Sequence, residues 1–208
     1  MANDAKVHVI DDDDALRQSL QFLLESAAMK VAAYESAAAF LNALPDINGG
    51  CVITDVRMPG MSGIELLKRL QDMKVGLPVI VITGHGDVPM AVEAMKGGAV
   101  DFIEKPFSDE VLLAAVRTAL GRQERVSQRE AERSEIAERL AALSNRERQV
   151  LDGLVAGHPN KTMAYNLGIS PRTVEIYRAN VMTKMHASSL SDLVRMALIA
   201  GLLGDEVA

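Results

Sequence analysis

Polar and charged residues come directly after several of the short apolar runs in the first half of the chain. Asp11 and Asp12 follow the first run, and Asp55, Thr83 and Lys105 stand at or just beyond the ends of three later runs. Carboxylates that lie close together repel one another, and a hard cation such as Mg²⁺ relieves that repulsion. A carboxylate beside such a cation can attack phosphorus and form an aspartyl phosphate. A lysine and a hydroxyl group would stabilise the phosphoryl charge during the transfer.

The elements that must bring these residues together alternate between strands and helices. Apolar, mostly β-branched runs predict strands at 7–10, 31–34, 51–54, 79–83 and 100–103. Helix-like stretches lie between and after them, at 14–28, 37–44, 63–73, 88–96 and from 109 onward. This alternation predicts an α/β fold with a doubly wound five-stranded parallel sheet, in which ligands bind at the carboxyl ends of the strands. Asp55 precedes the turn Val-Arg-Met-Pro-Gly, which leaves its side chain at that edge, so it is the predicted nucleophile.

The last part of the chain has the pattern of an all-α domain. Helices are predicted at 146–156, 160–167, 171–185 and 190–203. Gly168-Ile169-Ser170-Pro171 has the right length for the turn of a helix-turn-helix, with Ser170 as N-cap and Pro171 in the first turn of the next helix. That next helix has one apolar face with the spacing expected of core residues, namely Val174, Tyr177, Val181 and Met185.

The opposite face of this helix has the composition of a surface that reads DNA bases. An exposed isoleucine and alanine beside an arginine and a glutamate suit base edges, because apolar groups contact the thymine methyl and a glutamate accepts from the cytosine amino group. Basic residues around it suit phosphates, and residues 157–190 carry four basic residues against one acidic residue. The predicted DNA-contacting residues are Lys161, Arg172, Thr173, Glu175, Ile176, Arg178, Ala179 and Lys184.

Composition limits the class of protein. The chain has 208 residues, of which 49% are hydrophobic and 24% are charged, which is a globular balance. No apolar run reaches the roughly 18 residues that a membrane span requires, and the N-terminus lacks the layout of a signal peptide. The single cysteine excludes an internal disulfide framework and fits a reducing compartment, so a cytoplasmic location without membrane contact is expected.

Charge divides the chain into three parts. Residues 1–120 hold 10 Lys and Arg against 17 Asp and Glu, so DNA contact is expected only in the last third. The predicted domains are 1–122, a helical linker at 123–142, and 143–208. The strongly charged sequence RQERVSQREAERSEIAER favours a solvated linker helix, and a self-pairing coiled coil remains the alternative because its apolar residues are sparse but recurrent.

The motifs VHVIDDDD, VITDVRMPGMSG, VITGHGD and DFIEKPF resemble the receiver domain of two-component response regulators, a flavodoxin-like fold, over about residues 4–122. The resemblance implies that a histidine kinase phosphorylates Asp55. It also implies that Asp11, Asp12, Asp55 and the backbone carbonyl of Arg57 hold Mg²⁺.

The same resemblance assigns a switch. It implies that Thr83 and Lys105 bind the phosphoryl oxygens and that Phe102 is an aromatic switch that turns inward when Thr83 moves. The Lys105–Pro106 peptide bond is expected to be cis, as it usually is in the family.

Residues 143–206 resemble the four-helix LuxR/GerE-type DNA-binding domain, in which the last helix forms the dimer face. Glu175 stands where relatives often have lysine, so the recognised DNA sequence is expected to differ. A receiver joined to this domain is the arrangement of the FixJ/NarL family of response regulators. The linker and the string VEIYRANVMTKM are most similar to its nitrogen-fixation branch.

The resemblance to that branch implies a set of partners. They are a FixL-like, haem-based oxygen-sensing histidine kinase, a second copy of the chain after phosphorylation, a two-fold related promoter site in double-stranded DNA, and RNA polymerase. Phosphorylation is expected to relieve masking of the DNA-binding domain, to drive dimerisation and to activate nitrogen-fixation or microaerobic genes.

Two other functions are weighed against this one. A phosphohydrolase with an aspartate nucleophile would need a second acid near Asp55 and a substrate-covering insertion, and Val56 and Arg57 follow instead. A receiver that only clamps a dimer, without phosphorylation, would not need the intact set of Asp12, Asp55, Thr83 and Lys105. The chain is therefore expected to be a phosphorylation-dependent transcription factor rather than an enzyme that turns over a substrate.

Overall fold

The computed structural model of the chain describes residues 5–84 and 88–202. The chain divides into two compact units, Met1–Val126 and Ser127–Ala208, each with its own core.

The first unit is built on a parallel sheet of five strands in the order β2-β1-β3-β4-β5, which confirms the predicted doubly wound fold. The strands are β1 (Lys6–Ile10), β2 (Lys30–Tyr34), β3 (Gly50–Asp55), β4 (Val79–Thr83) and β5 (Asp101–Glu104). In the ladder, Ile10 pairs with Thr54, and Asp55 pairs with Ile82. The residues that follow these pairs therefore lie side by side at the carboxyl edge of the sheet.

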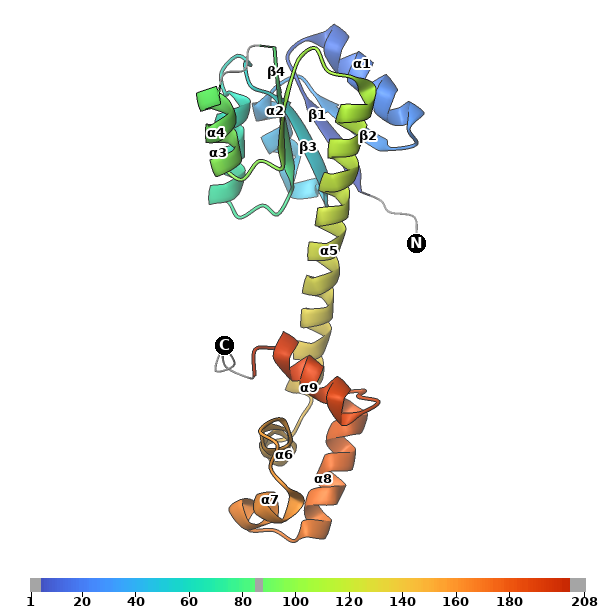
Figure 1. The fold of residues 1–208 in the computed structure, drawn as a ribbon, viewed down its shortest axis with the longest axis vertical. Coiled ribbons are helices and arrows are strands. Elements are labelled where there is room, and N and C mark those ends of the chain that lie inside the picture. The colour runs from blue at the N-terminus through green and yellow to red at the C-terminus, as the bar shows by residue number, and fades with distance from the viewer. Residues whose placement is uncertain (1–4, 85–87, 203–208) are drawn as a thin grey trace. The chain divides into compact units, whose positions relative to one another are not determined.

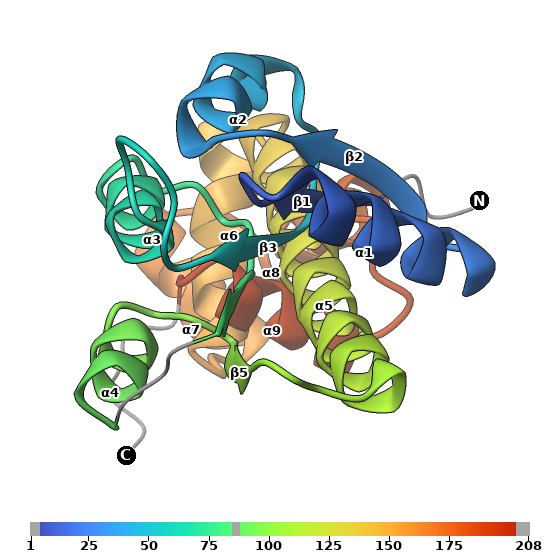
Figure 2. The same cartoon turned by 90° about the horizontal axis from the view of Figure 1, so that it is seen from above.

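Helices cover both faces of this sheet. The helix α1 (Asp14–Ser26) and the first turns of α5 (Asp109–Ala141) pack on one face, in a cluster that includes Leu20 and Val116. The other face is covered by α2 (Ala37–Ala43), α3 (Gly63–Asp72) and α4 (Val88–Lys96), and a 3₁₀ turn, η1 (Leu44–Asp46), follows α2. Figure 1 and Figure 2 show these two layers of helices on either side of the sheet.

The middle strand β3 is buried along its whole length, as expected for a parallel sheet covered on both faces. The lone cysteine of the chain, Cys51, lies in this strand and is fully buried. Burial raises the pKa of its thiol to about 12, so the thiol stays protonated at neutral pH.

Several helix boundaries differ by a few residues from those predicted. The helix α1 ends at Ser26 rather than at residue 28, because Ala28 has a left-handed φ of 60°. Asp13 is exposed and is the N-cap of α1, and its side chain accepts hydrogen bonds from the backbone N–H groups of Ala15 and Leu16.

The second unit is all-α. It contains α6 (Asn145–Val155), α7 (Asn160–Leu167), α8 (Pro171–Lys184), α9 (Leu190–Ile199) and the last turns of α5. Gly168 ends α7 in the left-handed conformation, with φ 65°, which confirms the predicted turn before α8. The helix α9 is shorter than the predicted 190–203, because it ends at Ile199 and Gly201 then has φ 71°. Residue 203 lies outside the described residues.

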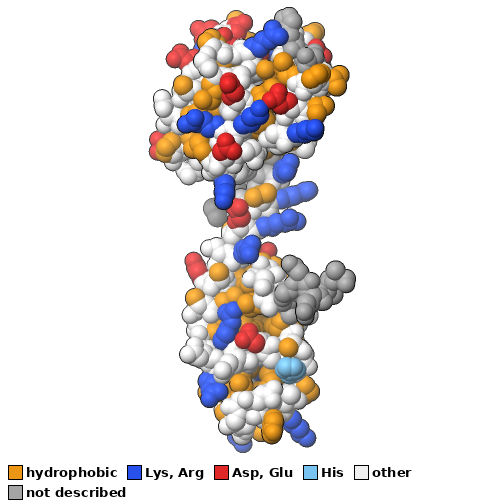
Figure 3. Space-filling view, turned by 90° about the vertical axis from the view of Figure 1, so that its left-hand side faces the viewer, with side chains coloured by type: hydrophobic (Ala, Val, Ile, Leu, Met, Phe, Trp, Pro, Cys, Tyr) orange, Lys and Arg blue, Asp and Glu red, His pale blue; other side chains and the backbone are white. Residues whose placement is uncertain are grey.

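The helix α5 is a single helix of 33 residues. Its middle part is solvated, with Val126 at 40% exposure, and Arg side chains, blue in Figure 3, line this part. Its last turns are not solvated on every face, since Ile136 is 2% exposed and lies in the core of the second unit with Leu140 packed against it. No helix in the described parts of the chain is long and apolar enough to cross a membrane.

Candidate functional site

Three of the predicted acidic-site residues meet at the carboxyl edge of the sheet. The Nζ atom of Lys105, just after β5, lies 2.6 Å from Oδ1 of Asp55 at the end of β3. The same Nζ atom lies 3.3 Å from Oδ2 of Asp11, just after β1. The strand register produces this arrangement, because residues 11 and 55 follow or end adjacent strands at the same level. One ammonium group therefore bridges two carboxylates from different strands.

Asp55 is held in place by its own loop and by α3. Its Oδ2 atom accepts a hydrogen bond of 2.6 Å from the backbone N–H of Arg57, while Asp55 as a whole is 7% exposed. Gly63, the first residue of α3, lies against it: a Cβ there would stand 2.2 Å from the carbonyl oxygen of Asp55. Sequence reasoning did not identify Gly63, although Ser62 and Glu65, which form a capping box in the structure, mark it as a helix start.

Asp11 is more deeply buried, at 2% exposure. Burial raises the pKa of its carboxyl group, while the backbone N–H of Asp13 at 2.9 Å and the ammonium of Lys105 act in the opposite direction. Arg17 of α1 donates from Nη1 to the carbonyl oxygen of Asp11 at 2.6 Å. Sequence reasoning missed Arg17, and its position one turn into the helix after the acidic run was the available signal.

Asp12 is exposed, and nothing described in the structure is hydrogen-bonded to its side chain. Among residues 5–84 and 88–202, no three His, Cys, Asp or Glu side chains are gathered closely enough to hold a metal ion by themselves. The pair Asp11 and Asp55 nevertheless fits Mg²⁺, because all its donors are oxygens and Mg²⁺ takes one or two carboxylates and keeps several waters.

Of the predicted switch residues, Thr83 lies on β4, the strand next to that of Asp55, and Phe102 lies on β5, one strand further from it. Thr83 is 1% exposed, and its carbonyl oxygen accepts a hydrogen bond of 2.8 Å from the backbone N–H of Lys105. Phe102 is half-buried against the core that faces α3 and α4. The Lys105–Pro106 peptide bond is cis, which confirms that prediction.

In the second unit, the buried and exposed faces of α8 largely match those that its sequence pattern predicts. Val174, Val181 and Met185 are buried in the core, and Tyr177 is half-buried against them. On the other side of the helix Ile176 is 57% exposed. Arg172, Glu175 and Ala179 are also exposed, whereas Thr173 and Arg178 are half-buried.

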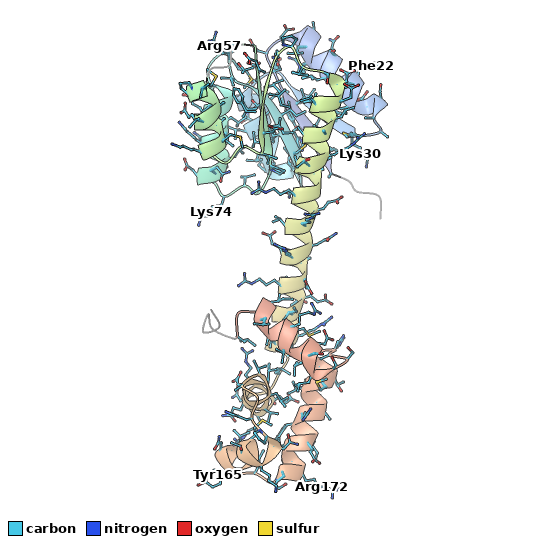
Figure 4. All side chains as sticks on the ribbon, viewed as in Figure 1. Phe22, Lys30, Arg57, Lys74, Tyr165 and Arg172 are labelled. Carbon is cyan, nitrogen blue, oxygen red and sulfur yellow. The ribbon has the colours of Figure 1, made fainter. Side chains whose placement is uncertain are left out.

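The start of α8 is fixed by its cap. The Ser170 hydroxyl oxygen accepts from the backbone N–H of Thr173 at 3.1 Å and lies 2.8 Å from the Thr173 hydroxyl. Lys161, on α7, is exposed. Figure 4 shows Tyr165 of α7 and Arg172 of α8 at the same end of this unit, and Tyr165, which the sequence analysis did not single out, is 89% exposed.

Lys184 lies apart from this group. It is 12 residues beyond Arg172, about 18 Å along the helix axis. Its ammonium lies 2.7 Å from Oε2 of the buried Glu147 and 3.3 Å from the carbonyl oxygen of Ala142. The ammonium and the cap residue Ser144 hold the pKa of Glu147 down, at about 2. Lys184 thus already has a structural partner within the unit.

Comparisons with known families match both units. Residues 7–117 match the family described as response regulator receiver domain, and residues 141–197 match the family described as bacterial regulatory proteins, luxR family.

Curated proteins match nearly the whole chain. The chain is 62% identical over 201 residues to the transcriptional regulatory protein FixJ of Azorhizobium caulinodans, covering 97% of this chain and 95% of that protein. It is 56% identical over 205 residues to FixJ of Bradyrhizobium diazoefficiens, covering 99% and 100%.

Two solved structures also match nearly the whole chain. Full-length FixJ from B. japonicum, at 56% identity, has a TM-score of 0.60 over 96% of this chain and 98% of that one. The response regulator StyR, at 39% identity, has a TM-score of 0.84 over 93% and 98%.

Proposed function

This chain belongs to the response regulators that join a receiver domain to a luxR-type DNA-binding domain, and we propose that phosphorylation of Asp55 switches its DNA binding. It is a two-component response regulator and a transcriptional regulator, and phosphorylation-driven activation is the mechanism of its family. The observation that carries the proposal is the contact of the Lys105 ammonium with Asp55 and Asp11 at the carboxyl edge of the sheet.

The proposed reaction is a transfer from a phosphohistidine of the kinase. A carboxylate oxygen of Asp55 attacks phosphorus, the bond from phosphorus to the imidazole nitrogen breaks, and the imidazole leaves. Lys105 is placed to stabilise the phosphoryl oxygens, and the Thr83 hydroxyl is the proposed second partner. The receiver then catalyses only its own phosphorylation and dephosphorylation.

The cation that this transfer uses is proposed to be Mg²⁺, which receiver domains typically bind. Asp11, Asp12, Asp55 and the backbone carbonyl of Arg57 are the proposed ligands. When bound, Mg²⁺ supplies positive charge that opposes the negative charge of the phosphoryl group. The burial of Asp11 and its approach to Lys105 support the assignment, because the site already tolerates a cation between these two carboxylates.

The proposed output is dimerisation followed by DNA binding. A phosphoryl group adds negative charge and acceptor oxygens beside Lys105 and Thr83, and Phe102 is the residue proposed to repack in response. The domains assigned to these roles are the receiver at 1–122, the helical linker at 123–142, and the DNA-binding domain at 143–208. Dimerisation and relief of masking then allow two copies of α8 to bind a two-fold related promoter site.

The exposed side of α8 is the proposed base-reading surface, from Arg172 through Glu175 and Ile176 to Ala179. Lys161 and Arg178 are proposed to contact phosphates. Thr173, whose hydroxyl lies in the cap, is proposed to contact the backbone near the start of the helix. Lys184 remains a proposed phosphate contact only if it exchanges its Glu147 partner for DNA.

The physiological role is proposed from the relatives. Their name, transcriptional regulatory protein FixJ, supports a role in transcriptional regulation. Activation of nitrogen-fixation or microaerobic genes, a FixL-like kinase as phosphodonor and RNA polymerase as a partner at the promoter are proposed from the same family resemblance.

The test is the mass of the full chain by light scattering, with and without Mg²⁺ and beryllofluoride, for wild type and Asp55→Asn. Beryllofluoride stands in for the phosphoryl group on a carboxylate. A doubling of mass in wild type alone is the expected result. The same mass in both proteins under both conditions would overturn dimerisation through Asp55.

A further inference from the structure

The last turns of α5 are bonded to the carboxyl end of the recognition helix α8. Arg139 of α5 donates from Nη1 to the carbonyl oxygen of Met185, the residue that caps α8, at 3.1 Å. In return Lys184, the last residue of α8, donates to the carbonyl oxygen of Ala142 at the end of α5, at 3.3 Å. Each helix thus supplies a cation to the carboxyl end of the other, where the helix dipole is negative.

Further contacts fix this arrangement. The Nη2 atom of Arg139 lies 2.5 Å from Oε1 of Glu135, which orients the guanidinium. Arg195 of α9 bridges Glu132 of α5 at 2.6 Å and Asp192 of its own helix at 3.0 Å. Ile136, between these polar residues, is buried in the core of the unit. Residues 132–142 are therefore part of the framework that holds α8 and α9.

We propose that Arg139 is a positioning residue for DNA recognition, which fixes the direction of α8 without touching DNA. The inference rests on the proposed function of α8 as the base-reading helix. Met185 lies 13 residues beyond Arg172, about 20 Å along the helix, so the contact of Arg139 is far from the base-reading end. A change in direction at one end of a rigid helix displaces the side chains at the other end.

The proposal predicts that Arg139 affects specific more than non-specific DNA binding. Phosphate contacts tolerate small changes in helix direction, whereas base contacts depend on exact hydrogen-bond geometry. A hydrogen bond from a charged donor corresponds to a factor of about ten or more in an equilibrium, so the loss of specific affinity is expected to be about tenfold.

The test uses the full chain activated with Mg²⁺ and beryllofluoride. Its probes are a duplex that wild type selects from a random library and an unselected duplex of equal length. Arg139→Met is compared with Arg133→Met, which removes an exposed arginine of the same helix that has no ion pair or hydrogen bond with any described residue. Arg139→Lys retains a donor for the Met185 carbonyl.

The expected result for Arg139→Met is about tenfold weaker binding of the selected duplex, with less than twofold change on the unselected duplex and an unchanged salt dependence. Arg139→Lys is expected to recover most of the loss, and Arg133→Met to behave as wild type on the ratio of the two affinities. A thermal midpoint measured for each variant establishes that it is folded.

Three results would overturn the proposal. If Arg139→Met bound both duplexes as tightly as wild type, the contact with the Met185 carbonyl would have no effect on DNA binding. An equal loss on both duplexes, with a salt slope reduced by about one, would make Arg139 a phosphate contact. An equal loss of affinity for the selected duplex in Arg133→Met would show that removing a positive charge from α5, rather than breaking the contact with Met185, weakens binding. Failure of the proposed function is distinguishable, because wild type would then select no duplex at all.

Discussion

The ammonium of Lys105 lies 2.6 Å from a carboxylate oxygen of Asp55, although 50 residues separate them in the chain. With Asp11 at 3.3 Å from the same nitrogen, Lys105 offsets part of the negative charge of two converging carboxylates. The loss of this cation has consequences that can be measured directly.

Lys105→Met is expected to lower the free energy of unfolding of the first unit by about 1–3 kcal/mol in metal-free buffer, because buried Asp11 loses a charged partner. Mg²⁺ should restore more stability to the variant than it adds to wild type, since the two carboxylates then have no other cation. Thermal unfolding with and without Mg²⁺ measures both effects. The control is Lys96→Met, an exposed position on α4, and an equal Mg²⁺ effect in all three proteins would contradict the prediction.

Gly63→Ala is expected to destabilise the first unit by about 1–3 kcal/mol or more, because the added Cβ would stand 2.2 Å from the Asp55 carbonyl oxygen. The same collision displaces Asp55, so beryllofluoride-dependent dimerisation should weaken as well. Gly121→Ala is the matched control. Outside the adjacent backbone of its own helix, no heavy atom lies within 4 Å of its added Cβ, so it should stabilise α5 by about 0.5–1 kcal/mol. Denaturant unfolding compares the two, and equal effects of the same sign would refute the steric argument.

The pair of Glu147 and Lys184 predicts a pH dependence of the second unit. The pKa of Glu147 falls from the ordinary 4.5 to about 2 in the folded state, so its contribution to stability is complete above pH 4.5. That contribution should disappear as the pH falls from 4.5 towards 2, as the carboxylate is protonated.

Hydrogen exchange of the α6 amides as a function of pH measures this loss of stability. Glu147→Gln should be less stable than wild type at neutral pH and should lose less stability between pH 4.5 and 2. A variant whose acid response matches that of wild type would assign the effect to other carboxylates, of which Asp192 also has a lowered pKa because of the Ser188 backbone and Arg195.

Substitutions on α8 and α7 can test base reading separately from phosphate binding. Glu175→Ala is expected to relax the preference at one base pair by about 1–3 kcal/mol. Lys161→Ala should instead weaken all duplexes alike and reduce the salt slope by about one. Binding titrations over a set of single-base variants at two salt concentrations distinguish these outcomes. Glu130→Ala, at an exposed position of α5, is the control, and a base preference unchanged in Glu175→Ala would remove Glu175 from the reading surface.

Most of the architecture follows from local pattern. The β-branched runs and the turn from Gly168 to Pro171 depend on residues close in sequence, and the structure confirms both. The capping boxes of Ser62 and Ser144 in the structure are equally local. The parallel α/β sheet follows from the alternation of strands and helices, whereas the order of its strands comes from the structure.

What the sequence did not reveal depends on contacts between distant segments. Gly63 is required because α3 starts against the Asp55 backbone, and nothing local in the sequence reports that approach. Lys184 resembles a phosphate ligand on a helical projection, yet Glu147 lies beside it only because α6 and α8 pack together. The last turns of α5 read as solvated because Ile136 is an isolated apolar residue among charges.

The burial of Cys51 makes the chain suitable for selective labelling at introduced cysteines. A thiol with no exposed surface and a pKa of about 12 reacts with maleimides and methanethiosulfonates far more slowly than an exposed cysteine. Cysteines introduced at exposed positions such as Ser19 of α1 and Asn180 of α8, one in each unit, would therefore take up spin labels or fluorophores selectively in the otherwise native sequence. Distances between such labels, measured before and after beryllofluoride, would follow activation without the need to replace the native thiol.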